Sequence, residues 1–404
     1  MQLTDHPEKH LTYCTNIHPG ESWNDVFNQL KNAVPELKNR ISPSNPFGIG
    51  LRLSGRAAST LLEGDRLKRL KDWLQSEQLY VFTMNGFPYG DFHGTRVKDN
   101  VYAPDWSDKK RVEYTLNLIK ILSQLLPKNM DGGISTSPLS YKFWAKNSLS
   151  EEDTFRKCSQ NLALIAYKMN QIAVEEQKDL HLDIEPEPDC LLENSRETVN
   201  FFQNWLLPEG CTFLSEQFGL KPKEAEAMLK KHIAVCYDTC HFAVEYEKPS
   251  QAIERLTKAD IRIGKMQISA ALKLDFSNNF NRNQMLNQLN AFEESTYLHQ
   301  VIERQEDGTL FQYRDLSEAL NHIQKPGIEE WRIHYHVPVF VDKFNMFNST
   351  RDDIIQSWVA SKKIDDCHHY EIETYTWEVL PEKLKSNLID SIEQEFQWVL
   401  KMIQ

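Results

Sequence analysis

Eight short apolar runs alternate with amphipathic stretches along these 404 residues, and this alternation limits the possible folds more than any other feature. Strands that alternate with helices of this length build βα units around a parallel sheet. The expected strands are Leu11–Ile17, Phe47–Leu53, Leu79–Met84, Gly133–Ser137, Leu180–Glu185, His232–Asp238, Ile261–Ser269 and Tyr370–Thr376. The expected helices include Ser22–Val34, Ala57–Ser76, Lys110–Leu126, Asp153–Glu176, Ser195–Leu206 and Pro381–Ile403.

Eight such units fit a (β/α)8 TIM barrel, which usually occupies about 250 residues and grows by loop insertion. The surplus falls mainly in Asn85–Trp106 and in 270–330, and Arg332–Phe340 makes a ninth apolar run. We therefore expect one TIM-barrel domain over residues 1–404, with a long insertion (270–330) packed on the barrel between strands seven and eight. An open doubly wound sheet is the alternative, weakened because no Gly-rich dinucleotide turn follows the first strand.

Charge and cysteine usage limit the partners and the compartment. The net charge of −12 and the lack of a basic stripe argue against a nucleic-acid partner. No apolar run reaches the eighteen or so residues of a membrane helix, and the polar N-terminus does not resemble a signal peptide. The seven scattered cysteines indicate free thiols. We expect a cytoplasmic protein without membrane insertion.

Carboxylates stand at the ends of three expected strands: Glu185 on the fifth, Asp238 on the sixth and Glu373 on the eighth. A barrel gathers its active-site groups at these C-terminal ends. Carboxylates that meet there repel one another unless a cation or shared protons neutralise them. A divalent metal ion is the simplest solution. With His241 as a further ligand, the mixed carboxylate and imidazole set suits zinc, manganese, iron or cobalt better than calcium.

Each carboxylate also has a purely structural interpretation. Asp238 suits the N-cap of a helix. Glu185 can be a solvated acid at a strand end, followed by Glu187. Glu371 has the same strand parity as Glu373 and competes with it, but Glu373 lies nearer the strand end and is preferred.

The histidines and one arginine complete the candidate set. His334 and His336 lie two apart on an extended run, so both face one way, either as metal ligands or as part of a half-buried strand face. Arg52 interrupts the second strand and needs a partner, which can be a structural carboxylate or a substrate anion. Cys236 and Cys240 flank Asp238 and are expected to be buried apolar side chains.

Further polar residues are candidates for substrate contacts at the same barrel mouth. They are Asn16, His18, Arg52, Asn85, His93 and His299. The loop from Phe87 to Phe92 suits a hydrophobic lid over a ligand, or a packed surface loop.

These residues resemble the xylose-isomerase-like TIM-barrel superfamily, which includes sugar isomerases, epimerases and the endonuclease IV group. The resemblance rests on Leu182–Pro186, Val235–His241 and Ile372–Thr374, and it implies a metal site formed by Glu185, Asp238, His241 and Glu373. Gln267 stands where the superfamily commonly has a histidine ligand. His334 and His336 match a spaced ligand pair of the nuclease group.

A narrower resemblance covers most of the chain, from His10 to about Pro381. The segments Thr12–Trp23, Asn85–Gly90 and Trp331–Val339 are similar to the EboE group of bacterial metabolite-traffic proteins. This resemblance implies a role in handling a secreted or periplasm-bound metabolite, with partners in a metabolite-export pathway.

Three functional hypotheses follow. The leading one is a metal-dependent isomerase or epimerase of a small sugar-like or polyhydroxylated metabolite, with Glu185 and Glu373 as the proton-exchanging residues. The second is a non-catalytic metabolite carrier that uses the barrel pocket for binding, which Gln267 favours. The third is an endonuclease IV-like phosphodiesterase, which the acidic charge disfavours.

Overall fold

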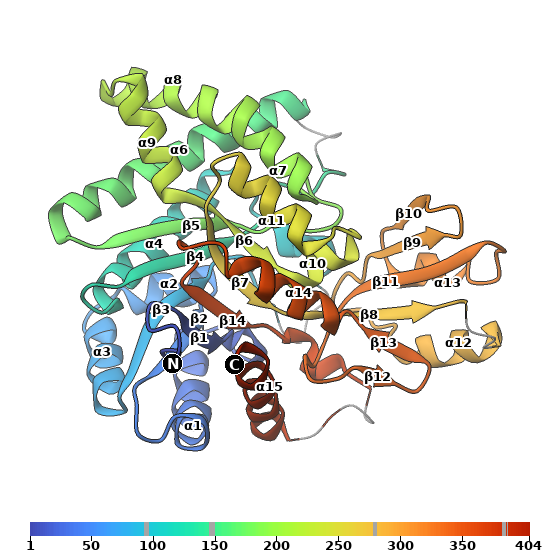
Figure 1. Cartoon of the computed structure of the whole chain (residues 1–404). Helices are drawn as coiled ribbons and strands as arrows, with labels where there is room; N and C mark the ends of the chain where they lie inside the picture. The colour runs from blue at the N-terminus through green and yellow to red at the C-terminus, as the bar shows by residue number, and fades with distance from the viewer. Residues whose placement is uncertain (93–96, 145–149, 278–280, 382–384, 386) are drawn as a thin grey trace.

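A computed structural model describes residues 1–92, 97–144, 150–277, 281–381, 385 and 387–404 (Figure 1). Its main feature is a sheet of eight parallel strands, which confirms the predicted strands with shifts of a few residues at their ends. The strands are β1 (His10–Tyr13), β2 (Phe47–Arg52), β3 (Leu79–Asn85), β4 (Asp131–Thr136), β5 (Asp179–Ile184), β6 (Ile233–Asp238), β7 (Ile263–Ile268) and β14 (His369–Ile372).

The eight strands curl into a barrel. Their order is β1-β14-β7-β6-β5-β4-β3-β2, and a parallel bridge between Cys14 and Gly50 joins the first and last strands of this series. The prediction of a (β/α)8 barrel is therefore confirmed, and the open doubly wound sheet is not.

Helices surround the barrel (Figure 1). They are α1 (Trp23–Ile41), α2 (Gly55–Leu61), α3 (Arg66–Ser76), α4 (Lys109–Leu125), α6 (Glu151–Glu176), α7 (Ser195–Phe201), α8 (Leu207–Phe218), α9 (Pro222–His232), α10 (Thr239–Val244), α11 (Pro249–Lys258), α14 (Arg351–Ser361) and α15 (Leu388–Ile403). The predicted helix Ala57–Ser76 is divided, because Gly64 has a φ of +62° between α2 and α3. The predicted helix Pro381–Ile403 begins later, at Leu388, which Asn387 caps through its side chain.

The long insertion lies between β7 and β14, as predicted, and forms a second sheet that is antiparallel. In Figure 1 it projects to the right of the barrel. Its elements are β8 (Ala270–Asp275), α12 (Arg282–Leu289), β9 (Val301–Gln305), β10 (Leu310–Tyr313), α13 (Leu316–Leu320), β11 (Ile328–Val337), β12 (Lys343–Phe344) and β13 (Phe347–Ser349). The ninth apolar run corresponds to β11, which pairs with β8 and β9 rather than with the barrel.

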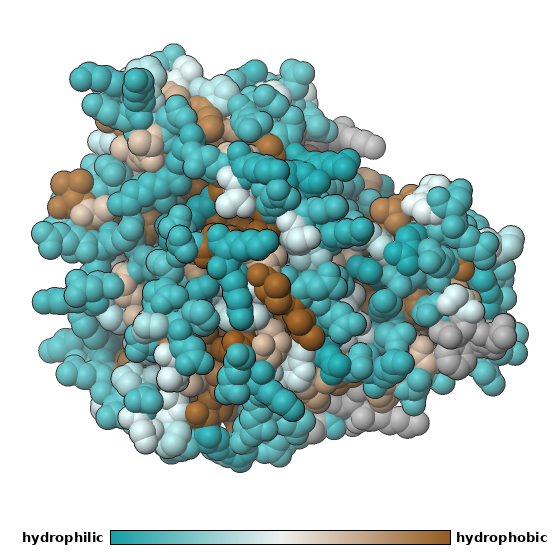
Figure 2. Space-filling view, viewed as in Figure 1, coloured by the Kyte–Doolittle hydropathy of each residue, from teal (hydrophilic) through white to brown (hydrophobic). Residues whose placement is uncertain are grey.

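The outer surface offers little apolar area on the face drawn in Figure 2, where hydrophilic residues dominate. Ile355 and Val359 of α14 are among the few large exposed hydrophobic side chains. None of the helices in the described part of the chain combines the length and the apolar character needed to cross a membrane.

The interior of the barrel is polar. The Nζ atom of Lys265 on β7 donates to Oε2 of Glu371 on β14 at 2.8 Å, and both side chains are fully buried. The same ammonium also contacts the carbonyl oxygen of Met84 (3.2 Å) and Oγ of Ser135 (3.3 Å), across the barrel on β3 and β4. Glu371 was considered only as a competitor of Glu373 for the mouth, and no interior role was predicted for Lys265.

The close approach of β2 to this ion pair predicts a steric requirement at Gly50. A Cβ atom there would lie 1.8 Å from Oε1 of Glu371 and 2.7 Å from the backbone oxygen of Tyr13. We expect Gly50→Ala to lower the free energy of unfolding by about 1–3 kcal/mol, as overpacked sites do. Urea denaturation measures this. Gly90→Ala is the control, because a Cβ atom at Gly90 meets no atom within 4 Å, and equal losses in both variants would contradict the prediction.

Candidate metal centre

A small cavity of about 50 Å³ lies at the C-terminal ends of the barrel strands. Polar side chains form its floor and aromatic and aliphatic side chains cover it. The polar lining consists of Asn16, Asn85, Lys98, Glu185, Glu187, His241, His334, His336 and Glu373. Phe87 and Phe92, from the loop for which a lid was one of two interpretations, line the cavity together with Tyr102, Tyr297 and Tyr375.

Three carboxylates meet here, two of them in the cavity lining and the third, Asp238, beside it. Oxygen atoms of Glu185, Asp238 and Glu373 lie within 4.8 Å of one another, and all three residues are buried. Burial, and then the charges of neighbouring carboxylates, raise the pKa of the Glu185 and Glu373 carboxyls well above the usual value. The strand ends therefore converge as predicted, and the arrangement is costly without protons or a cation.

Asp238 fills both roles that the sequence leaves open. Its Oδ1 caps α10 by accepting from the backbone N–H groups of Cys240 (2.7 Å) and His241 (3.0 Å). Oδ1 also accepts from Oγ of Ser269. Oδ2 is buried and has no hydrogen-bond partner among the described residues. One oxygen is fixed by the helix, and the other is left for a ligand.

Three imidazoles face the same place, and each is oriented by an oxygen behind it. Nδ1 of His241 lies 3.0 Å from the carbonyl oxygen of Pro186, and Nδ1 of His336 lies 2.9 Å from that of Glu373. Nδ1 of His334 lies 2.8 Å from Oε1 of Gln300. Since these oxygens only accept, we assign the proton to each Nδ1, which leaves the Nε2 lone pair free for a metal.

The protonation of these imidazoles suits metal binding. Burial lowers the pKa of His241 to about 4 and lowers the pKa values of His334 and His336 as well. All three rings are therefore neutral at pH 7, the form that binds a metal ion.

The donor set fits a divalent cation. In addition to Oδ2 of Asp238, the buried atoms Oε2 of Glu185, Nε2 of His334 and Nε2 of His336 have no hydrogen-bond partner within the described chain. Buried polar atoms are rarely left unpaired. Ligand atoms of Asp238, His241 and His336 also lie within 4.8 Å of one another. Carboxylate and imidazole ligands together are typical of zinc and its first-row neighbours.

Two asparagines hold Glu373 in place. The Nδ2 atoms of Asn16 and Asn85 donate to Oε1 of Glu373 at 2.7 and 3.1 Å. Both predicted pocket residues therefore line the cavity, and Oε2 of Glu373 remains available. The competing Glu371 lies deeper in the barrel, bonded to Lys265.

Gln267, the candidate metal ligand on β7, is hydrogen-bonded to a side chain of the neighbouring strand β6. It is buried opposite Asp238 in the β6–β7 register, but it is not part of the cavity lining. Its Oε1 accepts from Sγ of Cys236 at 3.1 Å, and its Nε2 has no hydrogen-bond partner in the described residues.

Three candidates for substrate contact are not brought to this cavity. Arg52 forms an ion pair with Glu21 at 2.7 Å and donates to the carbonyl oxygen of Gly90, so of its two alternatives the structure shows the structural one. His18 bonds the hydroxyl of Tyr13 instead. His299 lies behind His334, bonded to its carbonyl oxygen and to Glu294. His93 lies outside the described residues.

Glu187 belongs to the candidate site, although the sequence favoured a solvated acid just beyond the strand end. Its carboxyl lines the cavity 3.5 Å from Nδ1 of His334 and accepts from the hydroxyl of Tyr102 at 2.7 Å. Burial raises its pKa to about 8. The signal that could have found it is the strand parity it shares with Glu185.

No protein-family model matches the chain, and no curated protein matches it. A xylose isomerase-like TIM barrel protein from Mycobacterium smegmatis, solved in complex with magnesium, matches with a TM-score of 0.50 at 9% identity, covering 98% of this chain and 96% of that one. The chain has a xylose isomerase-like TIM-barrel fold. Identity this low shows the fold and not the function.

Two other solved structures match more weakly. The zinc-bound IOLI protein has a TM-score of 0.48 at 11% identity, with 98% of both chains covered. AsbF from Bacillus anthracis, a probable 3-DHS dehydratase, has a TM-score of 0.45 at 13% identity, with 97% of this chain and 98% of that chain covered. No conclusion is drawn from either.

The raised carboxyl pKa values predict how stability depends on pH. In the cation-free protein the folded state holds protons on Glu185 and Glu373 more tightly than the unfolded chain does, so stability falls as pH rises above the usual pKa of Glu. We expect Glu185→Gln to stabilise the cation-free protein by about 1–3 kcal/mol at pH 8, because the amide is neutral in the buried site without having to take up a proton, as the carboxyl must. Thermal unfolding between pH 5 and pH 8 measures this.

The matched control is Glu371→Gln. This change has the same chemistry but removes the partner of Lys265, so we expect it to destabilise the protein by about 3–5 kcal/mol. If Glu185→Gln also lowered stability at pH 8 in the presence of a chelator, the carboxylates would not be in electrostatic conflict.

Proposed function

We propose that this protein is a metal-dependent isomerase or epimerase that acts on a small polyhydroxylated, sugar-like metabolite. The observation that carries the proposal is the pair of buried carboxyls, Glu185 and Glu373, beside unpaired Asp238 and imidazole atoms at the barrel mouth. Proton-transfer enzymes place carboxyls with raised pKa values next to the reacting carbon.

Glu185, Asp238, His241, His336 and Glu373 would hold the cation. When bound, it polarises the carbonyl and hydroxyl oxygens of the substrate and so acidifies the carbon between them.

The residues of the chain would then move the proton. Glu185, whose Oε2 is unpaired, takes the proton from that carbon. Glu373, held by Asn16 and Asn85, returns a proton either to the opposite face of the same carbon or to its neighbour. The first outcome is epimerisation and the second is isomerisation, and neither needs an external oxidant or reductant.

The small size of the cavity sets a condition on substrate entry. Its volume of about 50 Å³ is far below the roughly 300 Å³ at which small-molecule pockets begin. The cover of Phe87, Phe92, Tyr102, Tyr297 and Tyr375 therefore has to move before a sugar can enter. Once closed again, these rings exclude water from the acidified carbon.

A second candidate is a non-catalytic metabolite-binding protein in metabolite trafficking, as the similarity to the EboE group implies. Gln267 favours it, because an amide bonded to Cys236 stands where related enzymes commonly have a histidine ligand. The cavity would then bind a polar metabolite through the cation without exchanging its protons.

Solvent hydrogen exchange tests the proposed function. The protein, loaded with manganese or zinc, is incubated in D₂O with a panel of aldoses, ketoses and sugar acids, and NMR follows deuterium entering the carbon adjacent to the carbonyl. We expect exchange with at least one member of the panel. Glu185→Gln and Glu373→Gln should slow it by about 10²–10⁴-fold, the usual contribution of a general acid or base.

Glu175→Gln, an exposed change on α6, should leave exchange intact. Full exchange in either site variant would overturn the assigned roles. Metal-dependent binding of a panel member by calorimetry, without any exchange, would support the trafficking alternative instead.

A further inference from the structure

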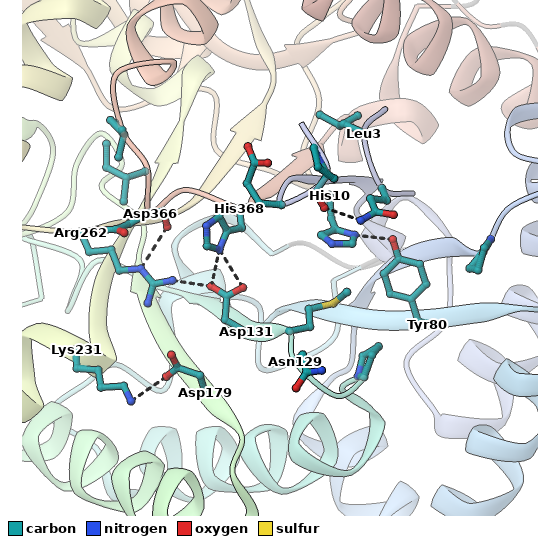
Figure 3. A pocket seen from close by; sticks show the side chains of 18 of the residues that line it. Leu3, His10, Tyr80, Asn129, Asp131, Asp179, Lys231, Arg262, Asp366 and His368 are labelled. Atoms are coloured by element: carbon teal, nitrogen blue, oxygen red, sulfur yellow. Dashed lines mark hydrogen bonds and ion pairs between the residues drawn. The ribbon is translucent and has the colours of Figure 1, made fainter. Parts of the chain in front are cut away.

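A second group of ionisable side chains lies at the opposite end of the barrel, where the strands begin. There the surface is hollowed into a bowl of about 1390 Å³ whose lining includes Asp131, Arg262 and His368 (Figure 3). His181 and His369 lie next to Asp131, buried within the barrel, and their ligand atoms and a carboxylate oxygen of Asp131 lie within 4.8 Å of one another. None of these residues takes part in the mouth site.

Three imidazoles converge on the Asp131 carboxylate. Nε2 of His181 lies 3.5 Å from its Oδ2, and Nε2 of His369 lies 3.4 Å from its Oδ1. Nδ1 of His368 lies 3.2 Å from Oδ1. Two ligand atoms bound about 2.0–2.1 Å from a tetrahedral zinc ion lie roughly 3.3–3.4 Å apart. The separations of His181 and His369 from Asp131 therefore suit ligands around a common ion, whereas His368 is hydrogen-bonded to both carboxylate oxygens at 3.2 and 3.3 Å.

His181 is oriented as metal-binding histidines usually are. Its Nδ1 lies 2.6 Å from Oδ1 of Asp183, a carboxylate that only accepts, so the proton belongs on Nδ1. Its Nε2, which faces Asp131, is fully buried and has no hydrogen-bond partner in the described part of the chain. In the neutral ring this lone pair would oppose the lone pairs of Asp131, an arrangement that a cation between them would stabilise.

The surroundings of Asp131 leave it able to bind. Arg262 donates to Oδ2 at 2.6 Å, which occupies one lone pair and fixes the carboxylate (Figure 3). A carboxylate offers about four lone-pair sites, so positions remain on both oxygens. His369 has its Nδ1 unpaired among the described residues, while its Nε2 lies 3.2 Å from the backbone oxygen of Asp131. Metal binding uses the tautomer in which Nδ1 carries the proton.

We propose that Asp131, His181 and His369 form a second site for a zinc-like divalent cation, at the floor of the barrel, with His368 as an outer hydrogen-bond partner of Asp131. One carboxylate and two imidazoles leave the fourth position of a tetrahedral zinc ion to a water molecule or to a ligand from the bowl. The ligands come from the first residue of β4, from β5 and from the start of β14, so the ion would tie together strands that are not all neighbours in the sheet. The bowl gives it access from solvent.

The two sites can be separated experimentally. In the double variant Asp238→Asn/His336→Ala the mouth site is disabled, and after chelation we expect this protein to bind one zinc ion per chain by elemental analysis and to gain thermal stability on binding. Cobalt in its place should give the intense visible absorption of a tetrahedral complex. Adding His368→Ala, a half-buried residue at the rim, should weaken zinc binding at least about tenfold.

His322→Ala, a change of another half-buried histidine in the inserted sheet, is the matched control and should not affect zinc affinity. Two results would overturn the proposal. One is a folded mouth-site double variant that binds neither zinc nor cobalt, and the other is a zinc affinity that His368→Ala and His181→Gln leave unchanged. Neither result bears on the mouth site, which the floor variants retain.

Discussion

The structure depends on how a barrel interior accommodates buried carboxylates. Glu185, Asp238 and Glu373 meet at the mouth, and the ammonium of Lys265, one layer below them, is already bonded to Glu371. A single lysine cannot neutralise this number of acids. Burial, and then the remaining charge imbalance, raise the pKa values of the Glu185 and Glu373 carboxyls, and a cation at the mouth would relieve both costs. The imbalance also explains why neutral donors such as Asn16 and Asn85 are aimed at Glu373.

The inserted sheet supplies what the barrel strands lack. Gln267 on β7 gives no imidazole to the mouth, whereas His334 and His336 reach it from β11, a strand that pairs only with the inserted strands β8 and β9. The β8–β11 register shifts between Ile333 and His336, so His334 lies in the irregular part of the ladder and His336 resumes the pairing opposite Ala271. The insertion is therefore part of the candidate site, because two of the three imidazoles at the mouth come from it and the third, His241, comes from α10 of the barrel.

The sequence predicted the strands well because their lengths and apolar content are local properties, and it predicted the mouth carboxylates because barrel topology fixes where strand ends meet. It could not choose between the partners of Arg52, because Glu21 is distant in sequence and its approach depends on the tertiary fold. Glu373 could be preferred to Glu371 from the sequence because it lies nearer the strand end. The sequence does not show why Glu371 is unavailable for the mouth site, because its bond to Lys265 is a contact between two strands. The floor cluster was missed although its signal was local.

That signal is an alternation unusual for parallel strands, which usually read as continuous apolar runs because both faces are buried. In β5, His181, Asp183 and Glu185 alternate with Leu180, Leu182 and Ile184, and in β14 His369, Glu371 and Glu373 alternate with Tyr370 and Ile372. The apolar positions face the helices and belong to the hydrophobic core, so the packing that stabilises the fold lies outside the barrel wall. The interior is thereby left to ionisable groups, with the Lys265–Glu371 pair separating those of the mouth from those of the floor. Substitutions inside the barrel should therefore change charge balance and cation binding, while substitutions on the outer face of the same strands should change packing.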